Sequence, residues 1–250
     1  MRENQDWLRR FQEGRHAVLG SGRLGTTLKN GMKALNFRME TEPDLADIIW
    51  ICIPENSIDE DLVRGIRNRN PLAVLVHTSG YLPASVLKLR PDDPAASLHP
   101  AYSFSRPLPS MPAGILWTVE GDAAVLPALE HMVSQWQGTA VRIAEERKPA
   151  YHLACVLLAN LALVPIAAAE TLTNSLGLDF VRMYDSLARP ILGSADLSDV
   201  GNRLTGPAAR GDRETISAQL EWLRVNRPDL VDLVDTLSRW ILDHPPGPPS

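Results

Sequence analysis

The sequence predicts an α/β fold in which an N-terminal parallel β-sheet is followed by an all-helical C-terminal domain. Up to about residue 144, short aliphatic and β-branched runs alternate with helical patterns, which is the order expected of a parallel sheet. From Glu145 onward the β-type runs disappear and long helical patterns replace them. We therefore expect a first domain at 1–144, a helical domain at 145–243 and a disordered, proline-rich tail at 244–250.

The predicted strands are apolar runs that end at turn residues. The runs at 47–53 and 72–76 are almost continuously apolar, which is typical of strands that are covered on both faces. Three further strand candidates lie at 16–19, 95–98 and 113–119. Helical patterns lie between the strands, at 24–35, 56–67 and 122–137, and a short surface helix is expected within 1–14.

The second domain is predicted to contain long helices at 148–176, 179–192 and 212–242. The segment 151–169 contains no Asp, Glu, Lys or Arg, and it is barely long enough to cross a membrane. Because it contains His152, Asn160 and Pro165, the pattern favours a buried helix over a membrane span. Pro165 predicts a kink, since it cannot donate a hydrogen bond to the carbonyl four residues earlier.

The composition excludes several classes of protein. The net charge is −5 and no basic block is present, so we expect neither a nucleic-acid nor a membrane partner. The N-terminal residues lack an apolar stretch of the kind that a signal peptide has. The two cysteines, Cys52 and Cys155, lie in apolar runs, which fits a reducing compartment and a cytoplasmic location. No Cys, His or Asp spacing predicts a metal site.

A glycine turn follows the first predicted strand and matches the pattern G-x-G-x-x-G. In such a turn the first glycine permits a tight bend, the second lets the backbone approach a pyrophosphate, and the third allows close packing of helix on strand. The following helix offers its unpaired N–H groups to the phosphates. This context predicts a Rossmann-type dinucleotide site formed by Gly20, Ser21, Gly22, Arg23, Leu24 and Gly25.

The segment after this helix is unusually short. Only Asn36 to Ala46 separates it from the next long strand, which leaves room for one short strand and no helix. Glu40 is at about the right distance to bind an adenosine ribose, and Arg38 could instead favour a 2′-phosphate. Alternatively, both are solvated loop charges. The sequence leaves open whether a whole dinucleotide still fits or whether the adenosine half of the site is truncated or absent.

Two further motifs follow predicted strands, where ligands bind in open parallel sheets. Pro54 follows the strand at 47–53, and His77, Ser79 and Gly80 follow the strand at 72–76. We expect these residues to face the cofactor. His77 has a side chain that can act as a general acid near neutral pH, but it could instead cap the strand by bonding to backbone groups.

Polar side chains interrupt the apolar helix at 148–176. Residues i and i+8 of a helix differ in direction by about 80°, so His152 and Asn160 share one face approximately. A polar pair in such surroundings needs a partner or a cavity. The pair therefore either contacts a substrate or belongs to a hydrogen-bonded network at a dimer interface.

Several motifs together resemble one known family, the bacterial Rossmann-like proteins with an uncharacterised helical C-terminal domain, within the 6-phosphogluconate-dehydrogenase-like superfamily. The family is similar to pyrroline-carboxylate, ketopantoate and prephenate reductases or dehydrogenases. The motifs are GSGRLG, DIIWICIPENSI, HTSG, SLHPAYSF, YHLACVLLANLALVPIAAAE and LTGPAARGD, in this order along nearly the whole chain. The resemblance implies NAD(P)-dependent hydride transfer and a homodimer formed through the helical domain.

The resemblance also suggests roles for particular residues. His99 resembles the His-Pro segment of prephenate dehydrogenases and could contact substrate with Ser103 as a partner, although it could equally be a turn histidine. Arg210 and Thr205 lie in a loop that could bind a carboxylate, as in pyrroline-carboxylate reductases, or form a plain turn. Related dehydrogenases carry a lysine four residues before the helical asparagine, where this chain has Val156. Catalysis would then depend on His99 or His152.

Together these observations predict an NAD(P)-dependent oxidoreductase that acts on a small metabolite, with a carboxylated one favoured. His99, His152 and Asn160 are the candidate catalytic residues. Arg23 and Arg38 favour NADP over NAD. The alternative is a non-catalytic Rossmann scaffold that senses a nucleotide or only dimerises, because the segment at 36–46 is short and the lysine is missing.

Overall fold

The computed structural model describes residues 2–193 and 201–246. The chain forms two compact units, Met1–Ala159 and Asn160–Ser250, which are considered separately below. The division lies later than the predicted boundary at residue 144. The reason is that the start of the helix α5 (Lys148–Val156) bonds to the sheet of the first unit, through Lys148 to Ser97 and through Tyr151 to His99.

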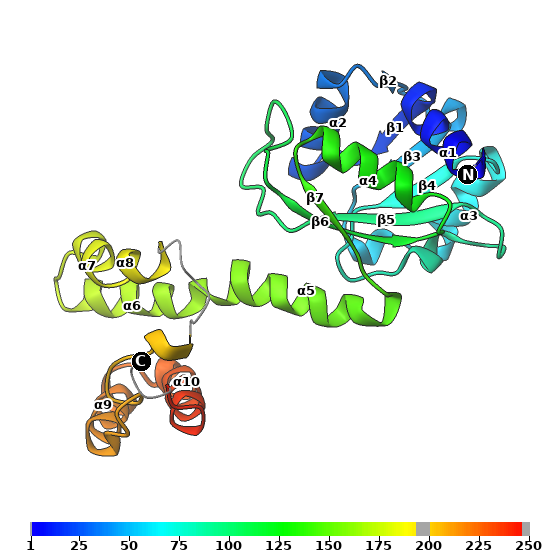
Figure 1. The fold of residues 1–250 in the computed structure, drawn as a ribbon. Helices are drawn as coiled ribbons and strands as arrows, with labels where there is room; N and C mark the ends of the chain where they lie inside the picture. Colours follow the sequence, from blue (N-terminus) through cyan, green and yellow to red (C-terminus); the bar gives the residue numbers. More distant parts are fainter. Residues whose placement is uncertain (1, 194–200, 247–250) are drawn as a thin grey trace. The chain divides into compact units, whose positions relative to one another are not determined.

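The first unit is built on one seven-stranded sheet with the order β2-β1-β3-β4-β5-β6-β7 (Figure 1). Its neighbouring strands are parallel except β5 and β6. The parallel sheet predicted from the sequence is confirmed for five of the six strand pairs, and β5 and β6 are antiparallel because their connection contains no crossover helix. The strands are β1 (Arg15–Leu19), β2 (Arg38–Met39), β3 (Ile48–Ile51), β4 (Val74–His77), β5 (Ala95–Pro100), β6 (Leu116–Gly121) and β7 (Thr139–Arg142).

Helices cover both faces of the sheet. Side chains alternate along β3, so that Ile48 and Trp50 join the core on one face while Ile49 and Ile51 join the core on the other. The first core receives α1 (Arg2–Glu13), α2 (Arg23–Ala34) and α4 (Leu126–Gln135). The second receives α3 (Glu60–Arg69) and the 3₁₀ turn η3 (Ala84–Leu87). The carboxyl ends of the central strands are thereby held in a rigid frame.

A buried histidine attaches α1 to the sheet. The Trp50 indole N–H donates to His16 Nδ1 at 3.0 Å, and His16 Nε2 donates to the Phe11 carbonyl at 2.7 Å. The His16 side chain is completely buried, and this burial lowers its pKa from 6.5 to about 4. His16 is therefore neutral in the folded protein and has a structural role.

The segment after α2 is as short as the sequence predicts. The strand β2 has only two residues, which pair with Arg15 and His16 of β1. The chain then passes through the 3₁₀ turn η1 (Pro43–Leu45) directly into β3, with no helix between the two strands. The short strand therefore ends well before the level of the glycine turn.

The second unit is helical throughout its described residues. Asp212 caps α9 by accepting a hydrogen bond from the Thr215 N–H. The single helix predicted at 212–242 is wrong, because Pro228 interrupts it and restricts the residue before it. The elements are α6 (Leu163–Ser175), α7 (Phe180–Leu187), α8 (Arg189–Leu192), η6 (Gly201–Arg203), α9 (Arg213–Asn226), η7 (Pro228–Leu230) and α10 (Val231–Asp243). In the predicted tail, 244–246 follow α10, while 247–250 lie outside the described residues.

The helix predicted at 148–176 is interrupted near Pro165. A π-helical turn, η5 (Leu157–Leu161), separates α5 from α6 and ends shortly before this proline. Such a wider turn is a common way to accommodate a missing backbone donor, and the kink predicted at Pro165 stays a prediction. Lys148, at the start of this helix, lies in the first unit and is buried.

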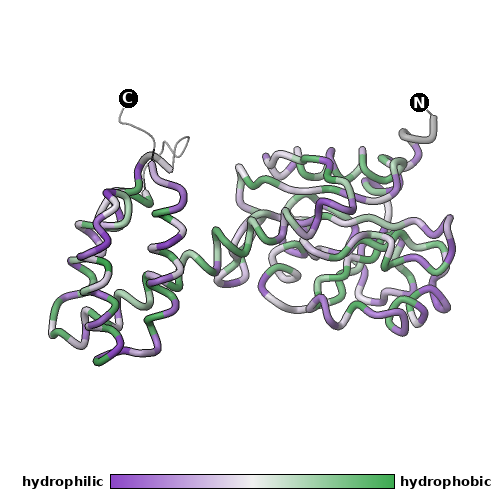
Figure 2. Tube along the Cα trace, turned by 90° about the horizontal axis from the view of Figure 1, so that it is seen from below, coloured by the Kyte–Doolittle hydropathy of each residue, from purple (hydrophilic) through white to green (hydrophobic). Residues whose placement is uncertain are grey.

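Most of the remaining side chains of this helix are exposed in the single chain, whereas the sequence predicts a buried helix. Tyr151 and His152 are partly buried, and Thr173 is buried. Leu158 is 82% exposed, and Leu153, Leu157, Leu161 and Leu163 are also exposed. The hydropathy colouring shows this helix as largely hydrophobic (Figure 2). Among the described residues, the helical stretch Glu145–Ser175 is the one that is long and apolar enough to cross a membrane by length and composition.

Candidate active site

The glycine turn has the geometry that a nucleotide site requires. Gly20 has a φ of +110°, and a Cβ atom on it would lie 2.2 Å from the carbonyl oxygen of Cys52. A Cβ on Gly25 would lie 2.6 Å from the carbonyl oxygen of Gly20. Only glycine fits at these two positions, because backbone atoms occupy the space. They hold β1, β3 and the start of α2 close together.

Gly22 differs from the other two glycines, because nothing lies within 4 Å of the position of its missing Cβ. It is the N-cap residue of α2, and no side chain caps this end of the helix. The N–H groups of the first turn are therefore available to an anion, and Arg23 adds an exposed positive charge beside them. These features fit a pyrophosphate group.

A cavity of about 410 Å³ begins at this turn. It extends past the end of β3 and the end of β4 to His99 in β5. Most of the cofactor-binding residues predicted from the sequence line it, including Pro54 and Gly80, while Gly20 and Ser21 support the turn from outside the lining. The lining residues are Gly22, Arg23, Leu24, Gly25, Cys52, Ile53, Pro54, Glu55, Thr78, Ser79, Gly80, His99 and Phe104.

Ser79 lines the cavity, but its hydroxyl group is committed to the turn. It donates a hydrogen bond to the carboxylate of Glu55 and accepts from the N–H groups of Tyr81 and Leu82, at 3.0 and 2.8 Å. These three bonds fix the turn after β4 against the loop after β3. Ser79 therefore shapes the cavity and has no free hydroxyl hydrogen to offer a ligand.

His77 has a structural role in the same turn. Its ring is completely buried, Nδ1 accepts from the N–H of Ser79 at 3.1 Å, and Nε2 donates to the carbonyl of Pro83 at 3.0 Å. Burial lowers its pKa to about 4, so the ring is neutral. Both nitrogens are occupied by backbone groups. His77 therefore caps the strand β4 by bonding to backbone groups, which is one of the two alternatives given by the sequence. Its ring nitrogens are not free to act as a general acid.

His99 forms a compact polar cluster with two residues of α5. A hydrogen bond of 2.7 Å joins His99 Nδ1 to the hydroxyl of Tyr151. The ring of His152 lies edge-on to that of His99, with the ring centres 6.5 Å apart. A Cβ on Gly80 would lie 3.0 Å from His99 Nε2 and 3.1 Å from His152 Cδ2. The two imidazoles therefore close over Gly80 at the edge of the cavity.

His99 and Tyr151 are both uncharged at neutral pH. Burial lowers the pKa of His99 to about 4, and the positive charge of Lys148 acts in the same direction. Burial raises the pKa of the Tyr151 phenol, which stays protonated. If the phenol donates to Nδ1, the remaining ring proton is on Nε2, beside Gly80. His99 can then donate a hydrogen bond to a ligand in the cavity.

Sequence reasoning missed Lys148, which lies behind this cluster. Its side chain is only 1% exposed, and Nζ donates to the hydroxyl of Ser97 at 2.7 Å and to the carbonyl of Ser79 at 3.3 Å. A signal was present in the sequence, because Lys148, Tyr151 and His152 are spaced i, i+3 and i+4 and so share one helical face.

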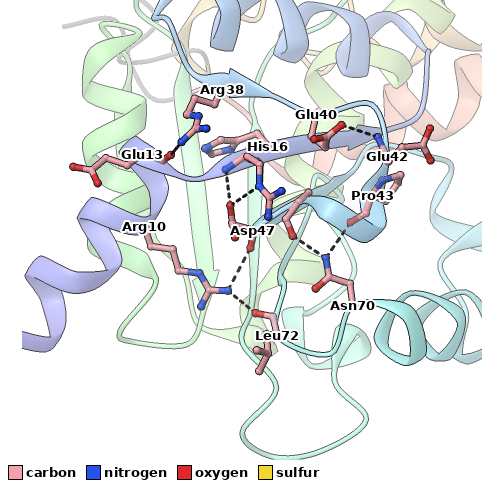
Figure 3. A network of polar contacts seen from close by, with 12 residues as sticks. Arg10, Glu13, His16, Arg38, Glu40, Glu42, Pro43, Asp47, Asn70 and Leu72 are labelled. Carbon is pink, nitrogen blue, oxygen red and sulfur yellow. Dashed lines mark hydrogen bonds and ion pairs between the residues drawn. The ribbon is translucent and has the colours of Figure 1, made fainter.

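The two charges predicted for the adenosine half are not in the cavity lining. The guanidinium of Arg38 donates to the carbonyl of Glu13 at 3.4 Å, and Figure 3 shows this contact at the end of α1. The carboxylate of Glu40 accepts from the N–H groups of Thr41 and Glu42, which lowers its pKa. Both side chains are therefore engaged with the surrounding backbone, as the solvated-loop alternative expects.

The remaining predicted residues are not gathered at the cluster. Ser103 is exposed, one residue before Phe104 of the cavity lining. Asn160, Thr205 and Arg210 are exposed residues of the second unit. Gly206, with a φ of +92°, and Gly211, with a φ of +71°, shape the loop that carries Arg210. The cavity itself is built by the first unit alone.

Comparison with solved structures identifies the fold. A candidate NADP oxidoreductase from Bacteroides fragilis matches with a TM-score of 0.73 and 21% identity, over 93% of this chain and 99% of the other. The protein TM1727 from Thermotoga maritima matches with a TM-score of 0.67 and 24% identity, over 92% and 98%. Pyrroline carboxylate reductase from Plasmodium falciparum, solved with NADP bound, matches with a TM-score of 0.56 and 10% identity, over 93% and 99%.

These matches show that the chain has the Rossmann-like fold that is shared by NAD(P)-dependent reductases and dehydrogenases, as the resemblance implied. No curated protein matches the sequence. A family profile described as a domain of unknown function, DUF2520, matches residues 115–241, from just before β6 to α10. Since this match covers slightly more than half of the chain, the protein belongs to the DUF2520 family.

Proposed function

We propose that this protein is an NAD(P)-dependent oxidoreductase that acts on a small metabolite. The observation that carries the proposal is the continuous cavity from the glycine turn to His99, which joins an anion-binding helix end to a polar cluster. Oxidoreductases of this type need both parts next to each other, because the cofactor must be held where a proton can be exchanged. The matches to NAD(P)-dependent reductases support the same assignment.

The residues present fit one half of the cofactor well. Gly22, Arg23 and the uncapped start of α2 would hold the pyrophosphate, and Pro54 and Gly80 would border the nicotinamide. When bound, the nicotinamide supplies or accepts the hydride. Arg23 is the remaining support for NADP over NAD, since Arg38 is turned toward the backbone of α1.

The chain's own contribution to the reaction is the control of a proton. His99 Nε2 would donate a hydrogen bond, and then a proton, to the oxygen or nitrogen of the bond being reduced. In the same step Nδ1 would take the phenol proton of Tyr151 across the 2.7 Å contact, and the partly exposed phenol would recover a proton from solvent. The substrate we propose is a small carbonyl or imine compound with a carboxylate. Arg210, Thr205, Ser103 and Asn160 remain candidates for contacts with it on the resemblance alone.

The direct test is calorimetric titration of the purified protein with NADPH and NADH. We expect at least one of them to bind with a dissociation constant below about 1 mM, the usual upper limit for such ligands. Consumption of NADPH can then be followed by absorbance with a panel of small oxo acids and cyclic imines. Absence of binding by either nucleotide at millimolar concentration would rule the proposal out and favour the non-catalytic scaffold.

We also propose that the protein is a cytoplasmic homodimer in which a second copy covers the exposed apolar face of α5 and α6. Leu158, 82% exposed, lies on this helical stretch. Sedimentation equilibrium should report a dimer for the wild type and a monomer for Leu158→Glu. Leu72, 77% exposed in the first unit, provides the matched control, and Leu72→Glu should remain dimeric. A wild-type monomer at micromolar concentration would contradict this assembly.

A further inference from the structure

The side chain of Lys148 occupies a position that is unusual for a lysine. It is 1% exposed, whereas the other lysines are partly or fully exposed. Burying an ammonium group is costly unless it is bonded and faces opposite charge. A simple packing role would be filled better by an apolar side chain. The hydrogen-bond partners of the Lys148 ammonium group therefore indicate the role of its positive charge.

Two neighbouring strands are joined through this ammonium group. It donates to the hydroxyl of Ser97 in β5 and to the carbonyl of Ser79 in the turn after β4. The Ser97 hydroxyl in turn donates to the same carbonyl at 3.2 Å. The Ser79 carbonyl in this small network belongs to the peptide bond that leads to Gly80, and Ser97 lies two residues before His99. The network fixes the backbone on which the two imidazoles rest.

The charges around the network are arranged asymmetrically. Three carboxylates favour the ammonium form of Lys148, namely those of Glu120, Glu55 and Glu145, although burial lowers its pKa. His99, in contrast, faces the positive charge of Lys148 and two further imidazoles, those of His152 and His77. The positive charge is therefore stabilised at the lysine and disfavoured on His99.

We propose that Lys148 is a positioning residue, whose ammonium group fixes the Thr78–Gly80 turn against His99 and determines the electrostatic environment of that imidazole. This positioning role rests on the proposed function in one respect, namely that His99 is the proton donor of the proposed reaction. The lysine is distinct from the one in related dehydrogenases, whose position here is Val156. It acts on the ligand through the turn and through His99.

The test is the titration of the His99 ring by NMR in the protein without ligand, with the signal assigned by its loss in His99→Asn. In the wild type we expect a pKa of about 4. In Lys148→Met, which retains the length of the side chain and removes the charge, the pKa should move measurably toward the ordinary value of 6.5. Lys148→Arg retains the charge and should keep the pKa low. Lys33→Met, at an exposed position on α2, is the matched control and should not move it.

A second measurement tests the positional part of the proposal. The amide signals of Ser79 and Gly80 should shift in Lys148→Met and in Ser97→Ala, which removes the acceptor but retains the charge. If Lys148→Met does not fold, the Ser97→Ala variant still tests whether the network positions the turn. Unchanged amide signals together with an unchanged His99 titration would overturn the proposal.

The outcome of the His99 titration can be distinguished from the outcome of the cofactor-binding test of the proposed function. If the wild type binds neither NADPH nor NADH, the oxidoreductase assignment fails, but the His99 titration still decides the role of Lys148. If the cofactor binds and the titration does not respond to the loss of the lysine charge, the function stands and the positioning role fails. If the wild type binds the cofactor and the His99 titration responds to the loss of the lysine charge, Lys148→Met should also weaken NADPH binding by about 10-fold. This is the loss expected when one hydrogen-bonded turn is displaced.

Discussion

Replacement of Gly22 by alanine is expected to weaken NADPH binding by about 100-fold without lowering the thermal stability. The backbone at Gly22 has a φ of −68° and a ψ of −179°, which alanine adopts without strain, and nothing lies within 4 Å of the new methyl group. The methyl group would keep a phosphate away from the N–H groups of α2. Losing one or two charge-assisted hydrogen bonds, at about 1.5 to 3 kcal/mol each, gives this magnitude. Calorimetry and a thermal unfolding curve measure the two effects.

Two other glycines provide the controls for this experiment. Gly65, inside α3, also has nothing within 4 Å and is not part of the cavity lining. Gly65→Ala should leave NADPH binding unchanged and stabilise the protein by about 0.5–1 kcal/mol. Gly20→Ala should lose stability as well as binding, because φ is +110° and backbone atoms fill the space. Normal NADPH binding by Gly22→Ala would show that the phosphates lie elsewhere.

Acidification is expected to destabilise the protein strongly between pH 7 and pH 5. His16 and His77 have pKa values lowered by burial from 6.5 to about 4, so the unfolded chain binds more protons than the folded one over this range. The free energy of unfolding therefore falls as the pH falls from 6.5 toward 4. Each of the two buried rings contributes a loss of about 2 kcal/mol at pH 5, which is a large part of the stability of a typical domain.

This dependence can be measured by denaturant unfolding at a series of pH values and a constant protein concentration. His77→Asn should be less stable than the wild type at pH 7, because the turn loses a cap, but it should lose less stability on acidification. The difference in slope corresponds to about one proton fewer taken up on unfolding. A free energy of unfolding that is constant from pH 7 to pH 5 would show that these rings are protonated in the folded state.

The sequence predicts the positions of strands well where both faces of the strand are buried. The runs containing β3 and β4 are apolar throughout, because both faces of the sheet are covered, and their ends mark the cavity. The strand β7 was missed because it lies at the sheet edge and only Ala140 on it is partly buried. An edge strand does not need an apolar run. The antiparallel pairing of β6 was also missed, since strand direction depends on the connection and not on the strand residues.

Within the candidate site, the cofactor side is easier to predict than the proton-handling side. Gly20 and Gly25 are required by backbone geometry, and that requirement leaves a recognisable pattern in the sequence. The roles of His77 and His99 depend on which groups their ring nitrogens meet, which is decided by tertiary contacts far apart in the chain. Lys148 was overlooked because a lysine near a helix start is ordinarily solvated, and only the packing of α5 on β5 buries it.

The position of Tyr151 and His152 has a consequence for the redesign of this protein. These side chains come from a single turn of α5, whereas the anion-binding part of the cavity is built by strand ends and by α2, more than 60 residues earlier in the chain. Under the proposed function, the residues that would hold the nucleotide and the two helical residues beside His99 are thus encoded in separate segments. A combinatorial library limited to positions 151 and 152 would vary the chemistry while leaving the nucleotide cradle intact. The same separation would allow natural selection to change the substrate by substitutions in one short stretch of helix.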